Sequence, residues 1–177
     1  VLLISSLVIP FSPALTEVNL SVNKCFGTKN GQQTGRSSWE QIHDVDKDQS
    51  GWTAFCEALK GTQSVQTLVL SDIGIGPMGL TTLAKFTPDS TALTAINVMK
   101  NPIGEDGLAT LMSAIEGTGV KTISGMTEGQ SSLDWSHQNL TPMDVKILAA
   151  DISFSPFTAA VTEVNLSMNK CFDAESS

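Results

Sequence analysis

The stretch 46–57 carries the side chains best suited to hold a metal ion. It matches the twelve-residue EF-hand loop, where positions 1, 3, 5 and 12 supply oxygen ligands and a glycine at position 6 allows the sharp turn. The donors are Asp46, Asp48, Ser50 and Glu57, and Gly51 holds the glycine position. Against this interpretation, the eighth position is Thr53 instead of a large aliphatic residue, and 51–59 is also explained as an ordinary helix capped by Ser50. Calcium binding at this loop is therefore the alternative hypothesis.

A glycine-rich turn further along has the form of a phosphate-binding loop. Residues 74–79 read G-x-G-x-x-G between an expected strand and an expected helix, as in dinucleotide-binding proteins. Residues 103–107 repeat the I-G-x-x-G part 28 residues later. In addition, Met99 and Lys100 stand where a ribose-binding acid is expected. The glycines therefore belong to a structural repeat, and no cofactor is expected.

The remaining polar residues form no pattern typical of catalysis. His43 and His137 have no His or Cys at metal-ligand spacing, and the sequence contains no G-x-S-x-G. Asp134 and His137 could be written as a dyad, but a pair of surface polar residues is the simpler interpretation. We expect a protein without enzymatic activity.

Composition narrows the classes of partner. The chain of 177 residues has a net charge of −8, which disfavours nucleic acid and anionic membrane surfaces because both require basic faces. The apolar stretch 1–11 is too short to span a bilayer, so no membrane insertion is expected. Its likeness to residues ahead of a later strand indicates the tail of a helix. Cys25, Cys56 and Cys171 are interpreted as reduced core residues, which favours an intracellular reducing compartment.

The chain is organised around a stretch that occurs twice. Residues 15–25 return almost unchanged as 161–171, and both read L-x-x-L-x-L-x-x-N-x-C with apolar residues in the L positions. Such a pattern predicts a short strand followed by an inward-turning asparagine. We expect Asn23, Asn101 and Asn169 to satisfy backbone groups where the strand bends into a loop.

The other expected strands and helices are spaced by one repeat period. Expected strands are centred on residues 18, 68, 96, 133 and 164, and expected helices cover 51–59, 79–86, 107–112 and 144–150. Their separations define a period of 28 residues, interrupted by insertions of 22, 9 and 3 residues. The chain therefore reads as one unit over 1–177, with loop insertions at 26–49 and 117–130. Either 120–126 or 131–136 could occupy the next position in the sheet, and the pattern does not decide between them.

With these motifs in place, the whole chain resembles leucine-rich-repeat proteins of the ribonuclease-inhibitor-like type. The likeness rests on the strand pattern and on helix starts of the form G-L-x-x-L, as at 79–83 and 107–111. It implies an α/β solenoid with a parallel β-sheet on its concave face and helices on its convex face. It also implies a binding role without catalysis. Because 12–25 recurs at 155–172, we interpret the chain as a segment of a longer array.

Strand residues that alternate with the apolar positions should face outward on the concave surface. They are mostly small and polar, with acids but no Lys or Arg. We predict that they bind a protein partner, with this chain acting as an interaction scaffold and as a possible subunit of a larger assembly. The candidate partner-binding residues are Glu17, Asn19, Ser21, Thr67, Val69, Asn97, Met99, Asp134, Glu163 and Asn165.

Overall fold

The computed structural model describes residues 14–26, 29–30, 42–60, 62–169 and 171. This part of the chain is a mixed α/β structure with short parallel strands and four α-helices. The helices are α2 (Ser50–Lys60), α3 (Pro77–Phe86), α4 (Gly104–Ile115) and α5 (Pro142–Phe154). The strands are β1 (Glu17–Asn19), β2 (Lys29–Asn30), β3 (Ile42–His43), β4 (Thr67–Val69), β5 (Ala95–Asn97), β6 (Ser132–Asp134) and β7 (Glu163–Asn165). Short 3-10 helices follow α3 at Thr87–Asp89 and α5 at Pro156–Ala160.

The strands form three small sheets. One is parallel with the order β1-β4-β5, and its register pairs the central residues Val18, Leu68 and Ile96. A second parallel pair joins β6 to β7, with Leu133 beside Val164. The third is the antiparallel pair of β2 and β3, which lies within the predicted insertion at 26–49.

The segment 120–124 occupies the position next to β5. The Ile96 amide donates to the carbonyl of Thr122 at 3.0 Å, and the Val98 amide donates to the carbonyl of Ile123 at 3.0 Å. Residues 132–134 instead begin the second parallel sheet. The two segments that the sequence left as alternatives therefore both serve as sheet neighbours, one to β5 and one to β7.

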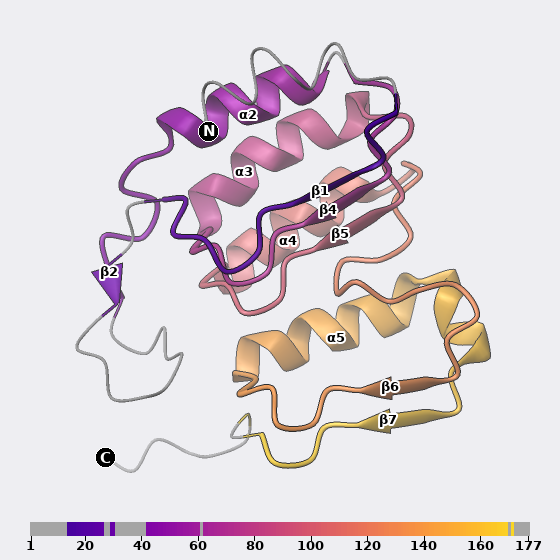
Figure 1. Ribbon diagram of the computed structural model, residues 1–177. Helices are drawn as coiled ribbons and strands as arrows, with labels where there is room; N and C mark the ends of the chain where they lie inside the picture. The colour runs from indigo at the N-terminus through magenta and orange to yellow at the C-terminus, as the bar shows by residue number, and fades with distance from the viewer. Residues whose placement is uncertain (1–13, 27–28, 31–41, 61, 170, 172–177) are drawn as a thin grey trace.

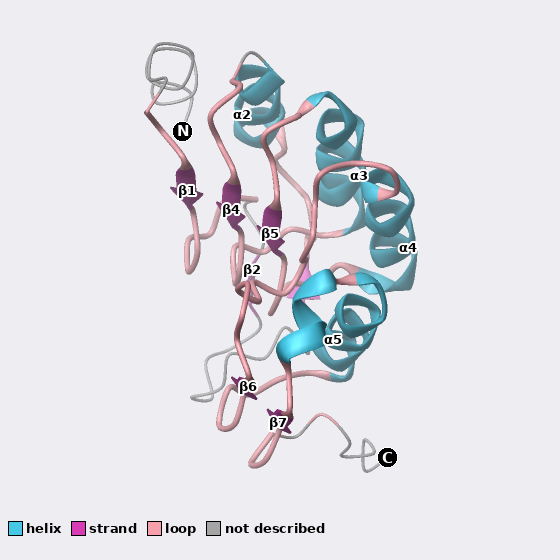
Figure 2. Ribbon diagram, turned by 90° about the vertical axis from the view of Figure 1, so that its right-hand side faces the viewer, coloured by secondary structure: helices cyan, strands magenta, loops and turns pink. Residues whose placement is uncertain are grey.

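Strands and helices lie on opposite sides of the molecule. In Figure 2 the strands of both parallel sheets follow one side, and α2, α3, α4 and α5 follow the other. The core between them contains the apolar positions of the sequence pattern, because alternate strand residues point toward the helices. Among its fully buried side chains are Leu68, Leu70, Ile73, Ile75, Leu80, Leu83, Leu93, Ile96 and Ile103.

A turn with left-handed backbone recurs after every strand of the parallel sheets. The residue five positions after the strand start has a φ between 56° and 61° in each case. These residues are Val22, Asp72, Lys100, His137 and Met168. Their separations repeat the period of 28 and the insertions of 22, 9 and 3 residues. The repeat spacing derived from the sequence is therefore also present in the backbone conformation.

Two of the three predicted asparagines, Asn101 and Asn169, satisfy backbone groups at the strand bends, as predicted, and they also link neighbouring turns. The side-chain oxygen of Asn101 accepts the amides of Ile73, Gly74 and Ile75 at 3.0–3.3 Å, and its nitrogen donates to the carbonyl of Leu70 at 2.7 Å. Asn169 likewise accepts the Leu140 amide and donates to the Trp135 carbonyl. One amide side chain can do this because it offers both an acceptor and two donors.

Asn23 shows the same turn without the bridge. It is exposed, and its side chain bonds the carbonyls of Leu20 and Ser21 in its own turn.

The expected helices are present, and each is longer than the pattern suggested. An EF-hand loop at 46–57 would need an entering helix, for which the sequence offers 37–44; at its described end this segment is instead a strand, Ile42–His43, followed by a bend at Asp44. The helix tail expected at 1–11 and residues 37–41 lie outside the described residues. Of the helices that the structure describes, none has the length and apolar character needed to cross a membrane.

Candidate functional site

The sheet of β1, β4 and β5 brings five of the predicted partner-binding residues into two rows. Glu17 and Thr67 pair in register with Ala95 in the first row, and Asn19 and Val69 pair with Asn97 in the second. Glu17 and Asn19 are exposed, and Thr67, Val69 and Asn97 are half-buried. A small polar surface with an acid at one edge therefore exists on the side of this sheet that faces away from the helices.

The second parallel sheet carries three more of the predicted residues, Asp134, Glu163 and Asn165. Asp134 pairs with Asn165, and Glu163 pairs with Ser132. Asp134 and Glu163 are exposed, so this pair of strands presents two acids. The predicted set is thus divided between two sheets instead of lying on one continuous sheet.

Four of the predicted residues also have a local structural role. The side-chain oxygens of Asn19, Asn97, Asp134 and Asn165 each accept the backbone amide two residues further on, at 2.9–3.1 Å. This Asx turn ends each strand and leads into the left-handed turn that follows. In Asp134 the hydrogen bond from the Ser136 amide lowers the pKa of the carboxyl group.

Met99 is not a surface residue, contrary to the sequence prediction. Its side chain is 4 % exposed and belongs to the core. The alternation expected of a strand stops at Asn97, because Met99 already lies in the Asx turn and donates its amide to the Asn97 side chain. The turn reverses the direction of the side chain. Ser21 is half-buried, and its hydroxyl donates to Asn19 at 2.6 Å.

The four residues of the predicted calcium loop do not share a common centre: Asp46 and Glu57 contact other parts of the chain, and Asp48 and Ser50 contact each other. Asp46 is 6 % exposed, and its carboxylate accepts the amides of Gly76, Met78 and Gly79 at 2.8–3.1 Å. Asp48 accepts the amide and the hydroxyl of Ser50 at the start of α2, and this contact lowers the pKa of its carboxyl group. Glu57 lies on α2 and pairs with Lys60 at 2.8 Å. Among the residues that the structure describes, no three His, Cys, Asp or Glu side chains gather as a metal-binding group.

The contacts of Asp46 also explain the role of the glycine-rich turn at 74–79. The amides of 76–79 begin α3, where the helix dipole and unpaired N–H groups attract an anion. A dinucleotide-binding turn would place a phosphate there. In this chain the carboxylate of Asp46 occupies that position, so the insertion at 26–49 is anchored to α3. The same insertion begins at Phe26, which is fully buried against Trp52.

A buried polar cluster not predicted from the sequence joins α5 to the segment 120–124. Asp151 is 0 % exposed, and its Oδ2 accepts the Thr122 hydroxyl at 2.7 Å, the Ser124 amide at 2.8 Å and the Ser124 hydroxyl. Its Oδ1 has no hydrogen-bond partner. The sequence feature that could have indicated this cluster is an acid, Asp151, four residues after Ile147 on the apolar face of an expected helix.

A second acid on α5 makes a similar connection. Asp144 is 1 % exposed and forms a capping box with Thr141 at the start of the helix. Its Oδ1 also accepts the Lys100 amide at 2.5 Å in the turn after β5. Polar contacts from Asp144 and Asp151 therefore hold α5 to the turn and segment around β5.

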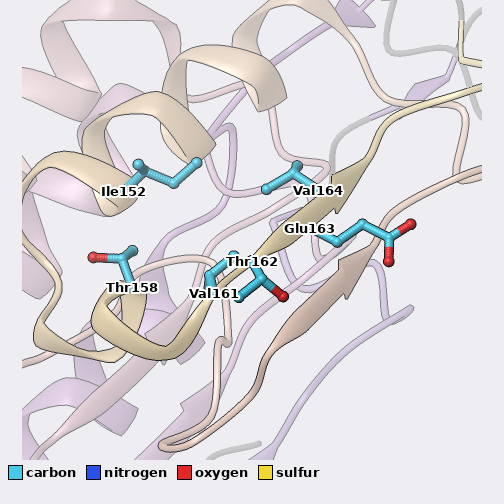
Figure 3. Close-up of a pocket in the computed structure, with 6 residues that line it drawn as sticks. All are labelled: Ile152, Thr158, Val161, Thr162, Glu163 and Val164. Carbon is cyan, nitrogen blue, oxygen red and sulfur yellow. The ribbon is translucent and has the colours of Figure 1, made fainter.

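A hollow of about 240 Å³ lies at the outer edge of β7. Figure 3 shows Ile152 of α5 and Val164 of β7 at this hollow, while the Glu163 side chain points away from Ile152. The lining residues are Ile152, Thr158, Val161, Thr162, Glu163 and Val164.

In comparisons with known proteins, no protein-family model matches the chain, and no curated protein matches it.

Proposed function

We propose that this chain is a segment of a leucine-rich-repeat solenoid of the ribonuclease-inhibitor-like type. Three features support the proposal: parallel strands in register, a left-handed turn at the same position after each strand, and asparagines that bridge turns about one repeat apart. Each feature repeats with the 28-residue period, and a shared core between units is the usual reason for such regularity. The division between β5 and β6 departs from a smooth horseshoe.

Its function is non-catalytic: it is a scaffold that binds a protein partner through the concave sheet face and the insertion loops. The observation that carries this proposal is the pair of rows across β1, β4 and β5, where four polar side chains lie beside the small apolar residues Val69 and Ala95. Such a surface can be approached closely by another protein, and the acids Glu17, Asp134 and Glu163 favour a basic or neutral partner surface.

The test is affinity capture from the native source with three forms of the chain. Thr67→Arg places a long cation in the middle of the rows, whereas Ser113→Arg makes a similar change on the exposed helix α4. We expect the wild type and Ser113→Arg to retain the same stoichiometric protein and Thr67→Arg to lose it. Equal retention by all three forms would refute binding at the concave face.

Parallel capture with calcium and with a chelator tests the alternative function. Retention only with calcium, abolished by Asp46→Ala together with Glu57→Gln, would favour a calcium-responsive module. Asp46→Ala also removes the hydrogen bonds that cap α3. The stability of the double variant must therefore be measured in parallel. Asp48→Asn is the milder variant for the same question.

A further inference from the structure

The outer edge of β7 exposes residues that are buried in every inner unit. Val164 is 43 % exposed, although the equivalent Leu68, Ile96 and Leu133 are at most 1 % exposed. Ile152 on α5 is 42 % exposed, and together with Val161 and Val164 it lines the hollow in Figure 3. The core is therefore open at this end of the described chain.

The first copy of the duplicated stretch shows what covers such an edge. Around β1, the Leu20 amide donates to Val69 at 2.9 Å, and the Val22 amide donates to Ser71 at 3.0 Å. The Thr16 carbonyl accepts the amides of Gln66 and Thr67. The segment 66–73 therefore seals the edge of β1.

The second copy offers the same groups without these partners. Leu166 and Met168 correspond to Leu20 and Val22, and Thr162 corresponds to Thr16. β7 is paired with β6 on its other edge, where Trp135 donates to Asn165 and His137 to Ser167. Within the described residues, the amides of Leu166 and Met168 donate to nothing.

We propose that the hollow beside β7 is the seat of a following strand–helix unit of the same polypeptide, of the sequence type of residues 26–86. The stretch 161–171 repeats the residues that lead into that unit at its first occurrence. The unit adds a parallel strand with an apolar residue beside Val164, as Leu68 lies beside Val18. It places an uncharged residue beside Glu163, as Thr67 lies beside Glu17.

Charge argues against a second copy stacked end to end at this edge. Such a stack would pair β7 of one molecule with β1 of the next and set Glu163 beside the Glu17 of the other molecule. Like charges side by side in adjacent strands are unfavourable. The inference rests on the proposed solenoid and on the pairing of β1 with β4, and it does not depend on the proposed partner-binding face.

The experiment joins a copy of residues 26–89 directly after Cys171 and measures amide hydrogen exchange. We expect the amides of Leu166 and Met168 to exchange at least tenfold more slowly than in the unextended chain and to approach the rates of Leu20 and Val22. The matched control carries Thr67→Glu in the added copy, with Thr67→Gln as its neutral counterpart. The glutamate should weaken the protection and the glutamine should retain it.

Unchanged exchange in an extended chain whose added helices form, as judged by circular dichroism, overturns the proposal. If the extension does not fold, a synthetic peptide of residues 62–76 is titrated into the full chain instead. Chemical-shift changes confined to Leu166, Met168 and their neighbours support the proposal, and their absence at millimolar peptide overturns it. Sedimentation of the unextended chain tests the alternative that a second copy of the chain binds at this edge. A dimer that is abolished by Val164→Asp would assign the edge to a second copy and overturn the proposal.

Discussion

Removal of the Asp151 carboxylate should destabilise the junction between α5 and the segment 120–124. In Asp151→Ala, the Ser124 amide and two hydroxyl groups lose their common acceptor inside a fully buried site. A buried donor left without a partner costs about 1–3 kcal/mol. Three such donors would cost at least about 3 kcal/mol, and because the hydroxyl groups can rotate toward other acceptors, we expect a total loss near this lower end, about 3–5 kcal/mol.

The measurement is the free energy of unfolding in urea, with Ser153→Ala as the control. Ser153 lies on the exposed face of the same helix and bonds only the carbonyl of its own turn, so its replacement should cost less than about 1 kcal/mol. Asp151→Asn keeps one side-chain oxygen as an acceptor, and it should cost less than half as much as Asp151→Ala. A cost below about 1 kcal/mol for Asp151→Ala would refute the view that this carboxylate holds the junction.

Four further predictions concern other buried groups. Asn101→Ala should lower the free energy of unfolding by about 3–5 kcal/mol because three buried amides lose their acceptor; urea unfolding measures the loss, and a cost below about 1 kcal/mol would contradict the bridging role. Asp46→Asn should cost about 1–2 kcal/mol by weakening the cap of α3, and equal thermal stability of this variant and the wild type would contradict it. Burial raises the pKa of Cys56 to about 12, whereas Cys25 is only half-buried. A thiol reagent at pH 8 should therefore label Cys25 first, and faster labelling of Cys56 in the native protein would contradict its burial. Because the folded state holds the Cys56 proton more tightly, its contribution to stability should decline as the pH rises above about 9, the ordinary thiol value.

The sequence by itself determined where the repeated strands and helices form, but it did not predict β2 and β3 within the insertion at 26–49. Apolar residues such as Leu68 and Ile96 recur with period 28, and this regularity reflects local geometry, because each unit must present the same face to a shared core. The inward asparagine at 101 follows from the same pattern, since an amide serves both donors and acceptors at a bend.

Only the tertiary structure decided how the insertions are used. Asp46 has the spacing of a metal ligand but meets the start of α3, 30 residues away in the chain. Asp151 looks like an interruption of an apolar helix face but meets Ser124, and Met99 turns into the core because an Asx turn ends the strand before it. The contacts of Asp46 and Asp151 join segments 30 and 27 residues apart, and the residue spacing does not reveal such contacts. The position of Met99 depends instead on a local turn, which breaks the alternation expected of a strand. The choice between a metal ligand and a helix cap depends on which unpaired amides folding brings within reach of the carboxylate.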